Sequence, residues 1–153
     1  QRTDCRFLII RTAWVFSEYG NNFFKTMLRL GAERDSLSIV GDQIGSPTYA
    51  QDIASLIVGL APQIESNNVE SGVYHFCGDT ACSWQQFAEE IFSQAKNLGY
   101  QTPKQIKSIA TKDYPTPASR PLYSALDCTK IQSTFDIKRS NWRQGISRAL
   151  TLL

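Results

Sequence analysis

The sequence predicts an α/β protein, and three observations lead to that class. Residues 7–10 are continuously apolar, which is typical of a strand buried on both faces of a parallel sheet. Residues 84–95 carry apolar side chains at helical spacing, which predicts an amphipathic helix. Strand-like and helix-like segments then alternate along the chain, as they do in proteins with parallel sheets. This pattern does not predict the order of the strands.

The elements after the first strand follow from spacing and capping residues. A helix is expected over residues 23–32, because Asn21 or Asn22 can cap it and its apolar positions recur on one face. Residues 37–40 are a short apolar run and predict a strand. A polar turn then leads towards the next helix.

The middle of the chain predicts a second helix and a strand. Thr48 and Gln51 have the spacing of a capping box, and the helix that they open is expected to stop at Pro62. Residues 63–71 are mostly polar and predict a surface loop, whereas residues 72–76 predict a strand.

The next helix shows the clearest pattern in the sequence. Ser83 and Gln86 form a second capping box, and Gly99 is suited to a left-handed residue just after the helix. The apolar face of this helix is Trp84, Phe87, Ala88, Ile91, Phe92 and Ala95. Residues 105–109 predict one more strand.

The last part of the chain begins with an irregular stretch. Residues 111–121 contain three of the six prolines, which excludes regular structure there. A short helix is expected to begin at residue 127 or 129 and to end near residue 135. Ser140 or Asn141 is expected to cap the final helix.

Composition and charge exclude several classes of protein. The 153 residues include 16 Lys and Arg and 14 Asp and Glu, which gives a formal net charge of +2. This net charge is small and the charged residues are evenly spread, so it does not favour nucleic-acid binding. No apolar run approaches the roughly 20 residues that span a bilayer. The four cysteines form no C-x-x-C pair, and a single histidine, His75, provides little material for a zinc site. We therefore expect a cytoplasmic protein with reduced thiols and without a metal site, a nucleic-acid partner or a membrane partner.

Catalytic motifs are missing from the sequence. It contains no G-x-G-x-x-G turn, no P-loop and no G-x-S-x-G elbow. Tyr100 and Lys104 have the Y-x-x-x-K spacing of short-chain dehydrogenases, but Gly99 and Pro103 prevent the helix that would place both on one face. No catalytic residue is predicted in this chain.

Three stretches remain as candidates for ligand binding: residues 11–16, 42–48 and 114–121. Trp14 follows a buried strand, where side chains line the ligand crevice of α/β sheets and an indole can stack on a flat ring. Core packing is an equal alternative for it. Arg120 lies in a proline-rich loop, which loses less entropy on binding, and arginine suits a phosphate. An ordinary surface salt bridge is the alternative for Arg120.

Together these stretches, with residues 20–23 and the S-A-L-D-x-x-K stretch at 124–130, resemble the dTDP-4-dehydrorhamnose reductase family of extended short-chain dehydrogenases/reductases. The similarity runs in order over essentially the whole chain. It implies that residues 1–153 are the carboxyl-terminal portion of a Rossmann-type reductase. The end of the nucleotide-binding domain would then be interleaved with a smaller substrate-binding domain. The amino-terminal Rossmann half, with the catalytic Tyr, Lys and Ser/Thr, would lie upstream of residue 1.

The resemblance also implies a reaction and a set of binding residues. Members of this family reduce dTDP-6-deoxy-L-lyxo-4-hexulose to dTDP-L-rhamnose with NADPH, so a dTDP-sugar is the expected substrate. A homodimer is possible, and the resemblance leaves this question open. The fragment alone is expected to be inactive and not to bind NADPH tightly, and its cofactor-binding residues are unknown. The substrate-binding residues implied are Trp14 beside the sugar, Asn21 and Asn22 at a helix start, Arg120 at the diphosphate, and Gln43 with Pro47 shaping the pocket. Tyr123 departs from the family, which has Asn at this place.

Two alternatives stay open, and two expectations test the interpretation. The chain could belong to a non-catalytic, reductase-like regulatory subunit, or to a reductase of another nucleotide sugar. If the resemblance holds, Trp14 and Arg120 should border one hollow. If residues 7–10 lie at a cut sheet, their apolar edge should cause self-association.

Overall fold

The computed structural model describes residues 6–66, 69–114 and 116–153, and it confirms the α/β class. In the first half of the chain the elements are β1 (Leu8–Arg11), β2 (Val15–Phe16), α1 (Phe23–Glu33), β3 (Ser36–Val40), β4 (Ile44–Gly45), β5 (Thr48–Tyr49) and α2 (Ala50–Glu65). In the second half they are β6 (Gly72–His75), β7 (Cys82–Ser83), α3 (Trp84–Asn97), β8 (Gln105–Ile109), the 3-10 turn η1 (Thr111–Asp113), α4 (Thr129–Phe135) and α5 (Trp142–Thr151). None of the described helices has both the length and the apolar character needed to cross a bilayer.

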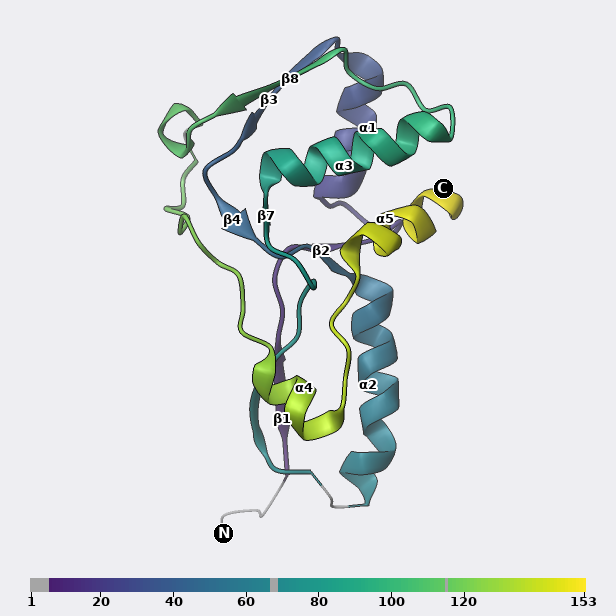
Figure 1. Ribbon diagram of the computed structural model, residues 1–153, viewed down its shortest axis with the longest axis vertical. Helices are drawn as coiled ribbons and strands as arrows, with labels where there is room; N and C mark the ends of the chain where they lie inside the picture. Colours follow the sequence, from purple (N-terminus) through teal and green to yellow (C-terminus); the bar gives the residue numbers. More distant parts are fainter. Residues whose placement is uncertain (1–5, 67–68, 115) are drawn as a thin grey trace.

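The elements form two parts, each with its own hydrophobic cluster (Figure 1). In one part, β1 pairs in parallel with β6, and α2 and α4 pack beside this pair. In the other, β3 pairs in parallel with β8, while α1, α3 and α5 enclose the larger cluster. The short pairs β2–β5 and β4–β7 lie where the two parts meet.

Strand β1 is covered on one face, not on two as predicted. Leu8 and Ile10 face the cluster shared with α2 and α4, whereas Ile9 is 49% exposed and Phe7 52% exposed. Val73, the partner of Ile9 on β6, is also exposed. A continuous apolar run is typical of a strand that is buried on both faces. Among the described residues, those of α2 and α4 cover one face of β1.

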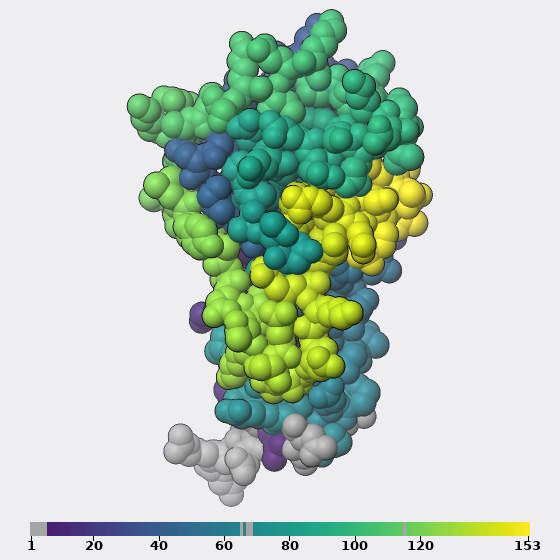
Figure 2. Space-filling model, in the orientation of Figure 1, coloured from purple at the N-terminus to yellow at the C-terminus, as the bar shows by residue number. Residues whose placement is uncertain are grey.

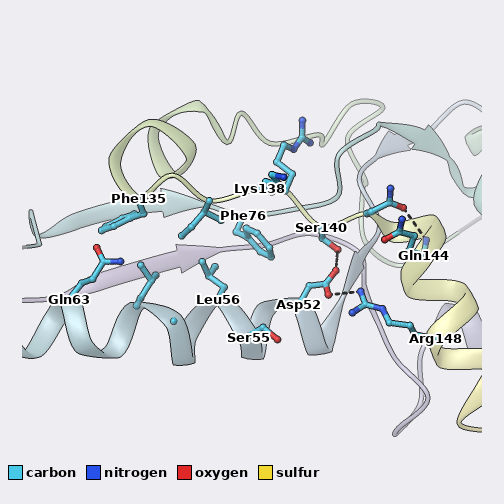
Figure 3. Close-up of a pocket in the computed structure, with 15 residues that line it drawn as sticks. Asp52, Ser55, Leu56, Gln63, Phe76, Phe135, Lys138, Ser140, Gln144 and Arg148 are labelled. Carbon is cyan, nitrogen blue, oxygen red and sulfur yellow. Dashed lines mark hydrogen bonds and ion pairs between the residues drawn. The ribbon is translucent and has the colours of Figure 1, made fainter.

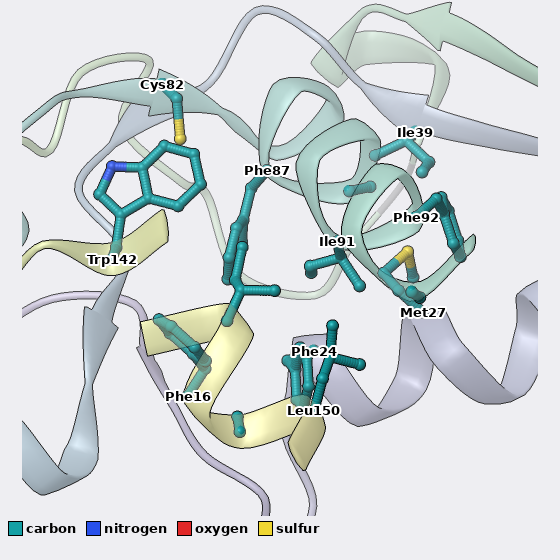
Figure 4. Close-up of a cluster of buried hydrophobic side chains, with 14 of the residues drawn as sticks. Phe16, Phe24, Met27, Ile39, Cys82, Phe87, Ile91, Phe92, Trp142 and Leu150 are labelled. Atoms are coloured by element: carbon teal, nitrogen blue, oxygen red, sulfur yellow. The ribbon is translucent and has the colours of Figure 1, made fainter. Parts of the chain in front are cut away.

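The larger cluster forms around Phe87 of α3 (Figure 4). Its ring meets Trp142 edge-on at a centroid distance of 5.6 Å and Phe16 at 5.2 Å. These contacts join α3 to α5 and to β2, and edge-to-face packing of this kind adds to the stability gained from burial. Helix α1 approaches α3 closely at Gly31, where a Cβ would lie 2.5 Å from the Phe92 ring.

Local capping chemistry confirms several of the predicted helix ends. The side chain of Asn22 accepts a hydrogen bond from the Lys25 amide at the start of α1. Ser83 and Gln86 form the predicted capping box at the start of α3. Gly99 has φ +84°, the left-handed conformation expected just after that helix.

Two predictions about α2 are wrong. Thr48 does not cap this helix, because it lies in β5 and its hydroxyl donates to the Ala13 carbonyl at 2.7 Å. Tyr49 takes the cap position without a side-chain hydrogen bond. The helix also continues through Pro62 to Glu65. Proline removes one hydrogen bond of the helix, but its carbonyl still accepts one, from the Ser66 amide.

Other details of the second half agree with the sequence or extend it. Residues 111–114 and 116–121 are irregular except for η1, and Asn141 caps α5 as predicted. The expected loop at 63–71 includes residues 67 and 68, which lie outside the described residues, and its Val69 is buried. The three described cysteines are free thiols, as expected.

Candidate functional site

A cavity of about 690 Å³ opens between α1, β3 and the segment after β8, and we call it the groove. The segment that closes one side of it, residues 111–114 and 116–120, is called the arm. The groove is lined by Phe23, Thr26, Met27, Leu30, Arg34, residues 36–40, Gln43, Trp84, Ile109, Asp113, Tyr114, Thr116 and Arg120. It therefore combines an apolar wall from α1 with polar and cationic groups from the arm.

The structure brings together some of the predicted site residues in the groove and not others. Arg120 and Gln43 both line it, although they are far apart in the sequence. Trp14, Asn21 and Asn22 are not among its lining residues. Pro47, which was expected to shape the pocket with Gln43, is fully buried elsewhere.

Trp14 does not line the groove but contacts a second tryptophan that does. Its indole stacks on that of Trp84, a lining residue, at a centroid distance of 3.5 Å with the planes 9° apart. Trp14 has φ +46°, a conformation that costs a bulky residue about 1–3 kcal/mol and that must be compensated by its surroundings. Gly45 leaves the space for the ring, because a Cβ there would lie 2.3 Å from it. Trp14 and Arg120 thus do not both border one hollow directly, and Trp84 stands between Trp14 and the groove.

Gln43 is buried and uses both ends of its amide within the protein. Its Nε2 donates to Thr111 Oγ1 at 3.1 Å, and its Oε1 accepts from the Trp84 indole N–H at 3.2 Å. A buried amide with both ends paired is held in one orientation. Gln43 therefore fixes the ring of Trp84 and shapes the wall of the groove.

Asp42 holds the start of the arm. Its carboxylate accepts hydrogen bonds from the Thr111 amide at 2.9 and 3.0 Å and from the Thr111 hydroxyl at 2.6 Å. The hydroxyl bond and then the amide bond hold the pKa of Asp42 below its usual value of 3.8. The carboxylate is therefore ionised near neutral pH and remains a strong acceptor.

The two asparagines have different roles. Asn22 uses its side chain to build the start of α1, where Oδ1 caps the helix and Nδ2 donates to the carbonyls of Ser17 and Tyr19. Asn21 is exposed, next to Gly20 with φ +64°. Neither side chain points to a particular ligand, but the helix start that they form offers amide N–H groups.

Trp84 is the functional candidate that the sequence analysis missed. Its apolar spacing assigned it to the core of α3, and it does pack against Phe23 at a centroid distance of 4.6 Å. It also occupies the first position of α3, directly after the Ser83 cap, and lines the groove. That position was the signal that could have identified it.

A second cavity, of about 600 Å³, lies between α2 and the segment that leads from α4 to α5 (Figure 3). None of the predicted site residues lines it. Its acid, Asp52, accepts hydrogen bonds from Ser140 Oγ and from Arg148, both at 2.6 Å. Lys138 and Arg139 also line this cavity. The groove is the stronger candidate because two of the predicted site residues, Gln43 and Arg120, line it.

Comparison with known proteins identifies the family of this chain. The family described as the RmlD substrate binding domain matches residues 1–153. A dTDP-4-dehydrorhamnose reductase of Aggregatibacter actinomycetemcomitans is 48% identical over 141 residues, which cover 91% of this chain and 48% of that protein. One from Sinorhizobium fredii is 40% identical and is covered to 49%. The chain thus spans about half the length of the curated relatives that it matches.

Solved structures give the same result. A dTDP-4-dehydrorhamnose reductase of Bacillus anthracis in complex with NADP superimposes with a TM-score of 0.82 at 35% identity, over 95% of this chain and 48% of that one. An orthologue from Clostridium acetobutylicum gives 0.80 at 34% identity, with the same coverage. The residues 1–153 therefore belong to the RmlD substrate-binding domain family.

Proposed function

We propose that this chain is the sugar-nucleotide-binding half of a dTDP-4-dehydrorhamnose reductase, which reduces dTDP-6-deoxy-L-lyxo-4-hexulose to dTDP-L-rhamnose with NADPH. The family membership and the names of the relatives support this reaction. The alternative of a non-catalytic subunit is not favoured, because these relatives are named as reductases. The cytoplasmic location and the homodimer stay predictions.

One observation carries the proposal: the groove joins an indole to two guanidinium groups. Arg120 on the arm and Arg34 after α1 both line it, and both are exposed. A guanidinium group donates two parallel hydrogen bonds to a phosphate, so each of these arginines suits a phosphate group. Trp84 supplies a ring against which a flat base or a sugar can pack. The groove therefore offers the chemistry that a nucleoside diphosphate sugar requires.

Trp14 and the start of α1 are proposed to act on the sugar side. Trp14 follows β1 directly, at the carboxyl end of a parallel strand, where α/β sheets bind ligands. Its stacking on Trp84 connects this end of β1 to the groove. In this proposal Asn21 and Asn22 place the amide N–H groups of α1 near the substrate.

NADPH is proposed to bind outside this chain. It would supply a hydride to the C4 ketone when bound. The sequence has no glycine-rich turn for its phosphates, so the residues present do not form a cofactor cradle. The cofactor and the catalytic Tyr and Lys are assigned to the half that the relatives have beyond the matched region. This chain's contribution is to bind and orient the dTDP-sugar.

The test is a calorimetric titration of the full-length protein with dTDP-rhamnose and with UDP-sugars. Replacing Arg120 by Ala should weaken dTDP-rhamnose binding about 10- to 100-fold, because a hydrogen bond to a charged group is lost. The matched control is Arg29→Ala, which removes an exposed arginine that pairs with Glu33 on α1 and does not line the groove. Equal affinity of the Arg120 variant and the wild type, or equal binding of UDP-sugars, would contradict the proposal.

A further inference from the structure

A chain of hydrogen bonds connects the arm to the wall of the groove. The hydroxyl of Thr111 donates to Asp42 Oδ1 at 2.6 Å and accepts from Gln43 Nε2 at 3.1 Å. Gln43 in turn accepts from the indole N–H of Trp84 at 3.2 Å. One hydroxyl group thus links the carboxylate that holds the arm to the amide that orients the ring.

This connection lies just beyond the end of a parallel strand pair. The β3–β8 ladder ends at Val40 and Ile109, and the Gly41 amide still donates to the Ile109 carbonyl at 2.9 Å. From there Asp42 continues the link through its side chain, because it binds both the amide and the hydroxyl of Thr111. These two residues are 69 positions apart in the sequence.

The residues just after the arm, 122–124, are bound to the same short segment of the chain. The Ile44 amide donates to the Leu122 carbonyl at 2.7 Å, and the Ser124 amide donates to the Ile44 carbonyl at 2.8 Å. Tyr123 bridges Ile44 within this contact, and its side chain is exposed. The arm is therefore a loop whose two ends are fixed to residues 42–44. Figure 2 shows the arm, in green, against this blue segment at the edge of the molecule.

Between these two ends, the hydrogen bonds given for the arm's described residues are local. The Asp113 amide donates to Ala110, the Tyr114 amide to Thr111, and the Thr116 hydroxyl to Ala118. Local bonds of this kind shape the loop but do not fix its place relative to the groove. Its position over the groove depends on the two ends.

We propose that Asp42 and Thr111 form a latch that positions the arm, and that this latch sets the affinity for the diphosphate part of the ligand through Arg120. The inference rests on the proposed function, because that function assigns the diphosphate to Arg120. Asp42 and Thr111 are positioning residues, because neither lines the groove. Loss of the Thr111 hydroxyl loosens the start of the arm, which keeps the bond from the Thr111 amide to Asp42, and it also removes the Thr111 partner of the Gln43 amide that holds Trp84.

The chain contains a matched control for this latch. Asp127 and Thr129 form the same pair of bonds, at 2.9 Å from the amide and 2.6 Å from the hydroxyl. They are two residues apart at the start of α4, they do not line the groove, and their bonds tie no distant segment. Thr129→Val therefore removes the same chemical group without affecting the arm.

The experiment uses the full-length protein with three variants: Thr111→Val, Thr111→Ser and Thr129→Val. Steady-state kinetics give KM for the dTDP-sugar, KM for NADPH and kcat. Thr111→Val should raise KM for the dTDP-sugar about three- to tenfold, as expected for the loss of one hydrogen bond, with kcat and the NADPH KM within about twofold. Thr111→Ser should restore the wild-type value because it keeps the hydroxyl, and Thr129→Val should match the wild type.

Hydrogen exchange of the Asp113 and Tyr114 amides gives a readout that needs no ligand. Thr111→Val should speed this exchange, whereas Thr129→Val should not. The latch is overturned if the two valine variants behave alike in exchange, if the serine variant fails to restore KM, or if kcat falls while KM is unchanged. If the wild-type protein shows no dTDP-sugar-dependent oxidation of NADPH, the proposed function fails and the link from the latch to the diphosphate fails with it. Faster arm exchange in Thr111→Val would then support the positioning role alone, and unchanged exchange would overturn that role too.

Discussion

The indole of Trp14 lies flat against the indole of Trp84, with the ring centroids 3.5 Å apart and the planes 9° from parallel. Trp14 follows β1, Trp84 begins α3, and both rings pack against the larger cluster. It places a strained residue at the end of a parallel strand next to a residue that lines the groove. The stack connects the stretch at residues 11–16 to Trp84, whose indole N–H donates to Gln43 in the stretch at residues 42–48.

Replacing Gly45 by Ala should disrupt this stack. A Cβ at this position would lie 2.3 Å from the Trp14 ring, so the ring must move, at a cost of about 1–3 kcal/mol in the free energy of unfolding. Near-ultraviolet circular dichroism should lose the signal of the coupled indoles. Gly59→Ala on α2 is the control, because a Cβ there meets nothing within 4 Å and alanine favours a helix. An unchanged indole signal in the Gly45 variant would refute the stack.

Replacing Tyr49 by Phe should destabilise the protein by about 1–3 kcal/mol. The Tyr49 hydroxyl donates to Glu18 Oε2 at 3.0 Å, and both residues are buried, so the variant leaves a buried acid without this donor. Burial and the bond to Glu18 raise the pKa of Tyr49 to about 12. Chemical denaturation measures the loss. Tyr19→Phe, at a tyrosine that is 76% exposed, should change stability little, and equal stabilities of the two variants would count against the buried pair.

Asp42 should contribute to stability in a pH-dependent way. Its folded pKa lies below 3.8, so the unfolded state takes up a proton first as the pH falls. The stabilisation by Asp42 is therefore fully present above the unfolded-state pKa, and it is lost as the pH falls through the lower pKa of the folded state. Asp42→Asn should lower Tm at pH 7, and the difference from the wild type should narrow below pH 3.8. A difference that stays constant down to that range would show that the carboxylate charge does not matter.

The exposed face of β1 and β6 should make the isolated 153-residue chain self-associate. Phe7, Ile9 and Val73 are each at least 38% exposed, and they present apolar side chains beside a strand edge. Light scattering should detect concentration-dependent association. Replacing Ile9 by Lys should reduce this association, because a charge on an exposed strand opposes edge pairing. A monomeric wild-type chain at high concentration would contradict this expectation.

Local chemistry made some features predictable. The Asn22 cap and the Ser83–Gln86 box depend on residues within three positions of each other, so the sequence contains all the partners. The identities of Arg120 and Gln43 as residues of one site came from the family resemblance, and the structure brings both to the groove.

Long-range contacts made other features unpredictable. Thr48 looked like a cap because its distant partner, the Ala13 carbonyl, is not visible in the local pattern. Trp84 satisfied a helical apolar pattern, which cannot distinguish a core side chain from one that also borders a cavity. The bond between Asp42 and Thr111 spans 69 residues and depends on the β3–β8 pairing, whose register no spacing rule supplies.

A crystal structure of the full-length protein with dTDP-rhamnose tests the central claim most directly. The account predicts that the diphosphate lies in the groove within hydrogen-bond distance of the Arg120 guanidinium, with the nucleotide against Trp84. A nucleotide bound in the second cavity, between α2 and α5, or on a surface that Arg120 does not reach, would contradict it.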